Sequence, residues 1–346
     1  MAAAGDTANS VISQVTRRWQ AIDPLLPGPG TPPPGCDAEL TVAGAGGQPL
    51  AVGTCEHWQG AAGSLDLAWG AARRFQLTPQ VAGPDVASGL DQLLSMWRDH
   101  LAGQPGTEGE DTAGVVTWPS RDIDGVGALL RHGLVPLAVI AARPTGRHPS
   151  GPEDGPPQPT GQAARDTSRA ARDTSRAGGT TRHDLRIRRA GPADIDAVVR
   201  LGLAVIRYDA HFSGTIERPG TADALRREAA GTLAQPDAWA WLAERDGTPI
   251  GMLYAERPEA AGWIAPMVRP APAAYLMLMV VLPGERGRGV GAALVARFHR
   301  EVDDAGVAVT LLHYEQVNPL SAPFWSQQGY RPLWTSWEVR PAGAIR

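Results

Sequence analysis

The chain has 346 residues, of which 43% are hydrophobic and 20% charged, with a formal net charge of −4. This length predicts two domains, and the modest charge gives no reason to expect a nucleic acid or a membrane as partner. The opening residues, MAAAGDTANSVISQV, lack the segments of a signal peptide, and no apolar run is long enough to span a membrane. The only cysteines, Cys36 and Cys55, are too few for a disulfide framework or a zinc site, so we expect a cytoplasmic protein without a metal.

Two stretches of the chain have the composition of connecting segments. A short one, rich in Pro and Gly, covers residues 24–35. A longer one, residues 143–183, is rich in Pro, Gly, Arg and Ser and has almost nothing apolar to bury, which predicts a disordered linker. The sequence AARDTSR occurs there twice in tandem. A basic segment could hold a partner, but we favour a duplication within a spacer.

Beyond the linker, strand and helix patterns alternate to the end of the chain. Pro192 suits the first turn of a helix, Thr221 is a candidate N-cap, and Asp246-Gly247 is typical of a hairpin turn. Gly329 is a candidate helix C-cap. Strands are predicted at 185–189, 239–244, 250–256, 275–282 and 307–314 and as a last pair that includes Trp334 and Trp337, and helices at 193–208, 221–233, 290–300 and 320–328.

The most informative segment follows the apolar strand 275–282. Pro283-Gly284 ends that strand, and Arg286-Gly287-Arg288-Gly289-Val290-Gly291 leads into a helix. Glycines let the backbone approach a ligand closely, and the unpaired N–H groups at a helix N-terminus favour anions. This strand, loop and helix therefore predict a pyrophosphate site.

Two glycine spacings in this loop are typical of two different pyrophosphate sites. Gly287-x-Gly289-x-x-Ala292 matches a dinucleotide fingerprint. However, four residues separate the strand from its first glycine, and too few strands follow for a doubly wound sheet. The other spacing is Arg286-x-x-Gly289-x-Gly291, preceded by Val281-x-Pro283. It resembles the coenzyme A loop of the GNAT N-acetyltransferase superfamily, and so does the downstream run Asn318-x5-Phe324-Trp325-x3-Gly329-Tyr330.

The resemblance covers residues 185–340 and implies acetyl-CoA as cofactor and acetyl transfer to an amine. It implies that the backbones of Met279 and Val281 bind the pantetheine arm and the thioester carbonyl. Asn318 has two open interpretations, a contact to the same arm or an Asx turn before Pro319. The cofactor-binding residues expected from the resemblance are Met279, Val281, Arg286, Gly287, Arg288, Gly289, Val290, Gly291, Asn318 and Phe324.

The acid and base are harder to assign, because Trp325 stands where the family often has a tyrosine. We name Tyr314 and Glu256 as candidate catalytic residues, and Glu315, Tyr208 and His211 stay open as alternatives. Tyr208, Asp209, His211 and Phe212 form a candidate binding site for a cationic amine, with aromatic walls and an anion. A small molecule and a peptide amine both remain open as the acceptor.

An internal comparison relates the first half to the second. At one fixed offset Asp122 aligns with Asn318, Gly133 with Gly329, Pro136 with Pro332 and Leu137 with Leu333. Residues 89–101 likewise resemble the helix after the glycine loop. Opposite that loop the first half has Pro84 and Asp85, which remove a donor and repel phosphate.

The predicted fold is α/β (α+β), with two tandem GNAT-like domains, each a mixed, mostly antiparallel sheet flanked by helices. The predicted domains are 1–142, degenerate, and 184–346, catalytic, joined by the linker 143–183. The first supports the second, lines its substrate cleft, or pairs with another copy in a homodimer. The alternative function is a non-catalytic acyl-CoA-binding or interaction protein.

Overall fold

The computed structural model describes residues 2–30, 36–44, 48–146, 185–212 and 214–346. Most of the predicted linker, residues 147–183, therefore lies outside the described residues, while Arg143 and Pro144 still belong to a strand. Among the described residues, no helix combines the length and the apolarity needed to cross a membrane.

The described helices and strands alternate along both halves of the chain. The first half contains α1 (Ala2–Ile22), β1 (Ala38–Ala43), β2 (Pro49–Gln59), the 3-10 helix η2 (Leu65–Trp69), β3 (Arg73–Val81), α2 (Val86–Ala102), β4 (Thr112–Pro119), α3 (Val126–Arg131) and β5 (Val135–Pro144). The second half contains β6 (Leu185–Arg189), α5 (Ile195–Asp209), α6 (Thr221–Leu233), β7 (Trp239–Arg245), β8 (Thr248–Glu256), β9 (Ala273–Val281), α7 (Val290–Asp304), β10 (Val309–Glu315), α8 (Ser321–Gln327) and β11 (Arg331–Val339).

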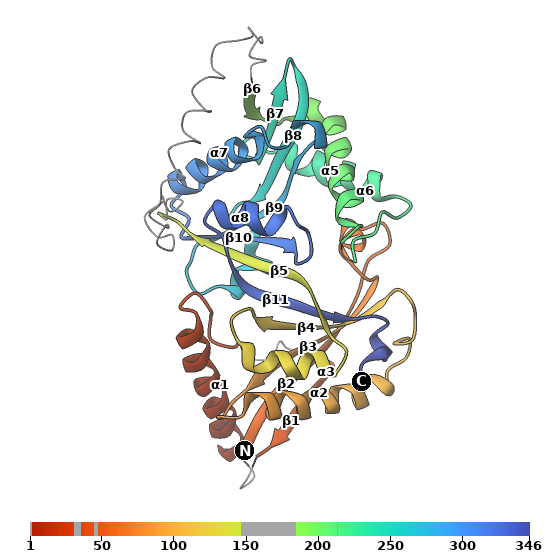
Figure 1. The fold of residues 1–346 in the computed structure, drawn as a ribbon, viewed down its shortest axis with the longest axis vertical. Helices are drawn as coiled ribbons and strands as arrows, with labels where there is room; N and C mark the ends of the chain where they lie inside the picture. The colour runs from red at the N-terminus through yellow and green to blue at the C-terminus, as the bar shows by residue number, and fades with distance from the viewer. Residues whose placement is uncertain (1, 31–35, 45–47, 147–184, 213) are drawn as a thin grey trace, which may run out of the picture.

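All the described strands join in one sheet of order β1-β2-β3-β4-β11-β5-β10-β9-β8-β7-β6 (Figure 1). The pairs β3–β4 and β9–β10 are parallel, and the other pairs are antiparallel. Helices flank this sheet, so the predicted fold class, a mixed and mostly antiparallel sheet with helices, is confirmed. The boundaries of the two predicted domains stay a prediction.

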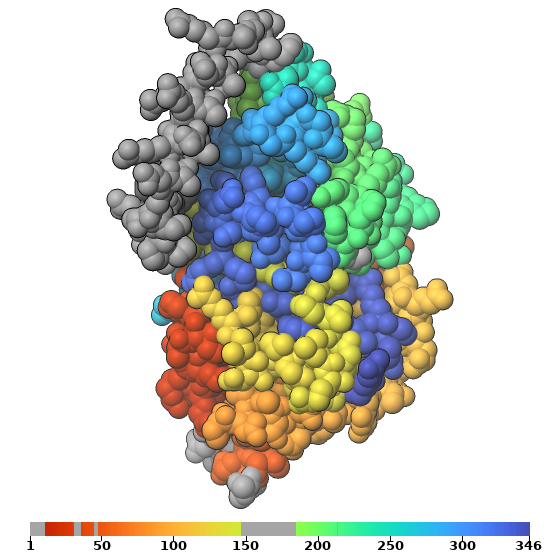
Figure 2. Space-filling model, viewed as in Figure 1, coloured from red at the N-terminus to blue at the C-terminus, as the bar shows by residue number. Residues whose placement is uncertain are grey.

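The last strand of each half is inserted beside strands of the other half. β5 lies between β10 and β11, and β11 lies between β4 and β5. The two insertions have equivalent registers. Thr310 pairs with Arg143, and Gly114 pairs with Val339. The fixed offset between the halves aligns Gly114 with Thr310 and Arg143 with Val339. In Figure 2 the blue C-terminal atoms accordingly lie against the yellow and orange first half.

Helices on both faces of the sheet bury its apolar side chains. α7 packs on one face, where Phe298 meets Trp239 and Trp241 edge to face at ring-centroid distances of 5.9 and 6.2 Å. α5 packs on the other face against a second apolar cluster that includes Leu242 and Leu278. Burying each side chain of this size stabilises the fold by about 2 kcal/mol.

Two local expectations were wrong. α6 begins after Gly220 at φ 86°, and the hydroxyl of Thr221 accepts a hydrogen bond from the backbone N–H of Arg218 instead of capping the helix. The expected last strand pair is a single strand, β11, because its neighbours in the sheet come from the first half. The hairpin turn at Asp246-Gly247, with φ of 51° and 75°, and the left-handed Gly329 are confirmed.

Candidate functional site

The glycine loop ends at the N-terminus of α7. Gly287 and Gly289 have φ of 72° and 79°, a conformation that L side chains rarely adopt, and Gly289 is the N-cap of α7. The N–H groups of the first helical turn have no acceptor within the helix and carry its positive dipole end. The absence of a side chain at Gly291 lets Phe324 of α8 approach, since a Cβ there would lie 3.3 Å from its ring. These residues form an anion-binding turn.

The two arginines of the loop have different positions. Arg286 turns back, donating from Nε to the carbonyl of Val281 at 3.0 Å, and its guanidinium lies 4.4 Å from the ring centroid of Tyr208. It therefore fixes the loop against the end of β9. Arg288 is 60% exposed, with Nη1 3.5 Å from a carboxylate oxygen of Glu285. Arg288 thus offers a cation at the surface of the loop.

β9 and β10 separate beside this loop. Their parallel pairing covers only Ala273 to Leu276 against Val309 to Leu312. A register shift between β8 and β9 occurs at the same level, between Tyr254 and Ala255. The backbone N–H of Leu282 donates to the carbonyl of Ile250 of β8 at 2.9 Å. Since alternate residues of a strand direct their backbone groups to opposite sides, Val281 and Met279 direct theirs toward the opening. We call this opening the fork; an extended ligand chain could pair there with β9.

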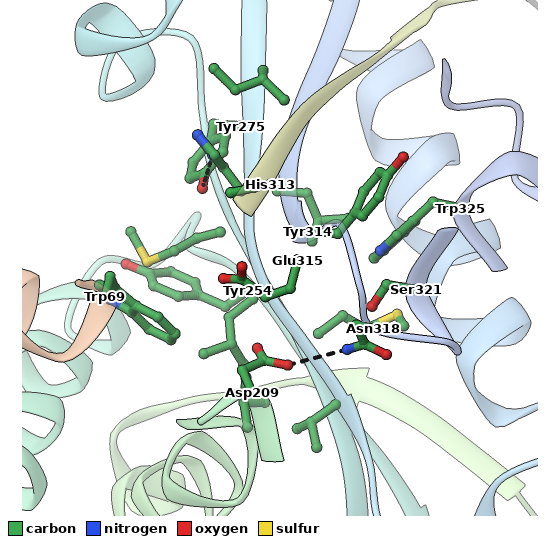
Figure 3. Close-up of a pocket in the computed structure, with 18 of the residues that line it drawn as sticks. Trp69, Asp209, Tyr254, Tyr275, His313, Tyr314, Glu315, Asn318, Ser321 and Trp325 are labelled. Carbon is green, nitrogen blue, oxygen red and sulfur yellow. Dashed lines mark hydrogen bonds between the residues drawn. The ribbon is translucent and has the colours of Figure 1, made fainter. Parts of the chain in front are cut away.

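A cavity of about 1520 Å³ joins the loop, the fork and a region between the two halves of the chain. In Figure 3, Trp69 and Tyr254 lie on one side of this pocket, and Ser321 and Trp325 lie on the other. Of the predicted cofactor-binding residues, all except Arg288 line the cavity. The structure thus brings the strand, loop and helix residues together around one space.

Asn318 makes two side-chain hydrogen bonds next to the loop. Its Oδ1 accepts from the backbone N–H of Leu320 at 3.0 Å, which is the Asx turn, and its Nδ2 donates to Asp209 at 3.3 Å (Figure 3). Burial raises the pKa of Asp209 to about 6, while the hydrogen bond from Asn318 and the charge of Arg286 act in the opposite direction. The geometry therefore favours the turn interpretation of Asn318.

The two candidate catalytic residues line the cavity at different levels. Glu256 ends β8, pairs with Tyr275 and accepts a hydrogen bond from the indole of Trp263 at 2.8 Å. Burial raises its pKa, against the effect of that hydrogen bond. Burial also raises the pKa of Tyr314, so its hydroxyl stays protonated at neutral pH. A carboxylate and a phenol are therefore available for proton transfer.

Of the four predicted acceptor residues, two line the cavity. Tyr208 and Asp209 line the cavity beside Arg286 and Asn318, at the end where the loop lies. Phe212 packs edge to face on Tyr208, and the exposed His211 donates from Nδ1 to the carbonyl of Arg207 at 2.9 Å. Neither His211 nor Phe212 is among the cavity-lining residues described.

Other residues of the site were missed by sequence reasoning. Tyr275 and His313 stand at the fork, with the tyrosine hydroxyl 2.9 Å from Nδ1 of the histidine (Figure 3). The first half contributes further residues to the cavity wall, and four of them have charged or aromatic side chains. No local pattern marks them, because folding places them there from separate elements. They are Trp58 of β2, Asp66 and Trp69 of η2, and Arg74 of β3.

Comparisons with known proteins agree with this geometry. Residues 208–330 match the model of the acetyltransferase (GNAT) family. A GCN5-related N-acetyltransferase from Sphaerobacter thermophilus is similar in fold, with a TM-score of 0.50 and 14% identity over 87% of this chain and 80% of that chain. One from Kribbella flavida has a TM-score of 0.41 and 14% identity over 94% and 92% of the two chains.

A shorter structure resembles one part of the chain. The paia N-acetyltransferase from Thermoplasma acidophilum, in complex with coenzyme A, covers 44% of this chain and 98% of its own, with a TM-score of 0.35 and 13% identity. No curated protein matches the sequence.

Proposed function

On the premise that residues 208–330 are a domain of the GNAT acetyltransferase family, we propose that this protein is an acetyl-CoA-dependent N-acetyltransferase that acts on a primary amine. The observation that carries the proposal is the left-handed turn of Gly287 and Gly289 at the N-terminus of α7, next to the fork. An anion site and an open strand edge in that arrangement suit the pyrophosphate and the amide-bearing arm of coenzyme A.

The residues present fit this cofactor. A Cβ built at Gly287 or Gly289 meets no atom within 4 Å, so open space stands in front of the turn where phosphate oxygens would lie. Arg288 would supply positive charge, the backbones of Met279 and Val281 would pair with the arm, and Phe324 would pack beside it. When bound, acetyl-CoA supplies an activated acyl group.

The protein's own groups would then orient the amine and move protons. Glu256 would accept the proton of the incoming ammonium, and its raised pKa would make it a better base than a carboxylate of ordinary pKa. The phenol of Tyr314 is the candidate donor to the departing sulfur. The backbone N–H of Met279 or Val281 would stabilise the negative charge that develops on the carbonyl oxygen.

Cofactor binding is tested by thermal unfolding with coenzyme A, because a ligand that binds only the native state raises Tm. Gly289→Glu should abolish the increase by placing bulk and negative charge in the turn. Gly220→Glu is the matched control, since Gly220 caps α6 at φ 86° and ψ −3°, close to the φ 79° and ψ −1° of Gly289, and also faces open space. An equal Tm increase in both variants would refute the site.

Catalysis is tested separately from binding. Wild-type protein, acetyl-CoA and a panel of amines should release free thiol in proportion to amine acetylation. A protein that binds coenzyme A but releases no thiol with any amine would instead support the non-catalytic acyl-CoA-binding alternative.

A further inference from the structure

The cavity extends beyond the fork into a space between the two halves of the chain. We call this space the acceptor chamber. The first half and the second half each supply part of its wall, and Figure 3 shows Trp69 of the one beside Tyr254 of the other. The chamber is lined by Trp58, Asp66, Trp69, Arg74, Glu228, Tyr254, Glu256 and Trp263.

The first-half wall is held in place by contacts with the second half. The backbone N–H of Ile216 donates to the carbonyl of Ala68 at 2.9 Å, and Arg218 donates to the carbonyl of Leu67 at 2.7 Å. Arg218 also forms a two-pronged ion pair with Asp111 at 2.7 and 2.8 Å. Since two backbone carbonyls of η2 accept hydrogen bonds from the second half, η2 is held in place at the chamber wall.

The chamber carries an excess of negative charge. Its lining includes three carboxylates, of Asp66, Glu228 and Glu256, and one guanidinium, of Arg74. Within the chamber, burial raises the pKa of Glu228, and the charges of Asp66 and Glu256 raise it further. Glu228 is thus close enough to Asp66 and to Glu256 to be repelled by both, and a bound cation would relieve that repulsion.

Arg74 lies beside Asp66 and donates to backbone carbonyls. Its guanidinium lies 4.5 Å from the ring centroid of Trp58, and it donates to the carbonyls of Ala71 and Asp66 at 3.2 and 3.3 Å. The guanidinium of Arg74 makes the potential of the chamber less negative. Because its donors bind backbone carbonyls, it does not occupy the place of a cationic ligand between the carboxylates.

Aromatic side chains complete the walls. Trp58, Trp69 and Trp263 present faces or edges to the same space as the carboxylates. Indole faces attract ammonium groups and also pack against methylene chains. The volume of about 1520 Å³ exceeds the 300–1,000 Å³ or so of ordinary ligand pockets, which leaves room for an acceptor beside the coenzyme A arm.

We infer that the acceptor is an amine with at least two positive charges, and this inference rests on the proposed function. One ammonium is held among Asp66, Glu228 and the tryptophans, and the nitrogen that reacts lies at the fork beside Glu256. That nitrogen, as an ammonium, loses one proton to Glu256 and forms the N–C bond to the acetyl carbonyl. As the C–S bond breaks, the nitrogen loses its second proton, which restores the phenol of Tyr314 after that phenol has given its own proton to the sulfur, and the sulfur leaves as a free thiol. A linear polyamine and an aminocyclitol share this chemistry.

The test compares amines that differ in charge, with free-thiol release as the readout. The panel is propylamine, 1,3-diaminopropane, spermidine and an aminocyclitol. We expect kcat/KM for the diamine or a larger amine to exceed that for propylamine by about tenfold or more, as one added charge contact would give. A preference for spermidine or for the aminocyclitol then shows which of the two classes of amine is the acceptor.

Variants locate the effect in the chamber. Glu228→Gln and Asp66→Asn should each reduce the ratio between diamine and propylamine, mainly through KM for the diamine. Asp223→Asn, which removes an exposed charge from the same helix as Glu228 but outside the cavity, is the control. The Tm increase with coenzyme A should persist in all three variants.

The outcomes separate this inference from the function on which it rests. Equal kcat/KM for propylamine and the diamine, with coenzyme A binding intact, would overturn the oligocationic acceptor and leave acetyl transfer standing. Loss of the coenzyme A response in wild type would refute the function itself. If no amine is acetylated, calorimetry of spermidine on the coenzyme A-saturated protein decides: binding tighter than propylamine by tenfold supports the chamber, and no binding overturns it.

Discussion

The hydroxyl of Tyr275 and Nδ1 of His313 lie 2.9 Å apart at the fork, on the two strands that separate there. Trp263 packs on both rings, edge to face on Tyr275 at 4.9 Å and stacked on His313 at 6.3 Å between centroids. His313 lines the cavity, and its desolvation there lowers its pKa to about 4. The imidazole is therefore neutral at pH 7, and its Nδ1 can accept a hydrogen bond from the tyrosine hydroxyl.

This neutral histidine gives a pH dependence with a defined sign. Because its folded pKa of about 4 is below its unfolded value of about 6.5, the unfolded chain binds more protons in that interval, and stability falls as pH decreases from 6.5 to 4. His313→Gln should remove that part of the loss. The Tm of the variant minus the Tm of wild type should increase as the pH decreases from 6.5 to 4, and it should stay constant above pH 7. A flat difference would contradict the prediction.

Asp209 predicts the opposite slope. Its folded pKa of about 6 lies above the unfolded value of about 3.9, so the native state binds more protons between these values and ionisation at higher pH destabilises it. Asp209→Asn cannot ionise. Relative to wild type it should therefore gain Tm as pH rises from 4 to 7. Thermal melts in matched buffers measure this, and a relative loss over that range would disprove the buried carboxylate.

Much of this fold could be predicted from the sequence because its elements depend on local patterns. Residues 221–233 match α6, and the hairpin at Asp246-Gly247 was expected from two residues that tolerate positive φ. The glycine loop before α7 was found for the same reason, since a left-handed turn at a helix N-terminus requires glycine at fixed positions.

Strand pairing could not be predicted in the same way. β5 and β11 have similar patterns and each fits beside either β4 or β10, so the sequence alone does not say which half each strand joins. The acceptor chamber could not be predicted for a related reason. Asp66 and Glu228 are far apart in the chain, and only the docking of η2 on α5 and α6 brings them to one space. Their role depends on long-range contacts that no single segment records.

A buried ion pair joins the N-terminal segment to β11. Asp23 is 1% exposed; its Oδ1 accepts from Nη2 of Arg331 at 2.7 Å and from the backbone N–H of Leu25 at 2.9 Å. Asp23→Asn removes the charge and leaves Arg331 largely buried without its anion, so it should lower the free energy of unfolding by about 3 kcal/mol. Urea denaturation measures this.

The control for Asp23 is an exposed pair. Asp99 is 71% exposed and lies 2.8 Å from Arg98. Asp99→Asn should lower the free energy of unfolding by less than about 1 kcal/mol, because water solvates both partners. Similar losses in the two variants would show that Asp23 contributes no more than a surface charge.

The proposed acid can be separated from its neighbour in α8. Tyr314 keeps its proton at neutral pH, whereas the indole of Trp325 does not donate one to a leaving sulfur. Tyr314→Phe should therefore lower kcat by about 100-fold with little change in KM, and Trp325→Phe should keep most of kcat. Steady-state thiol release over a pH range provides the measurement. A Tyr314→Phe variant with unchanged kcat would indicate that the sulfur departs without a tyrosine donor.

Coenzyme A should bind once per chain. In the first half, the residue corresponding to the phosphate turn is Asp85, the N-cap of α2, whose carboxylate already accepts from the backbone N–H of Ser88 at 2.9 Å. The carboxylate of Asp85 accepts from a backbone N–H group that a phosphate would need, and its negative charge repels a phosphate at the N-terminus of α2. Calorimetry of the full chain should give a stoichiometry near one, and Gly289→Glu should abolish all binding. A value near two, with half of it surviving in Gly289→Glu, would show a working second site in the first half.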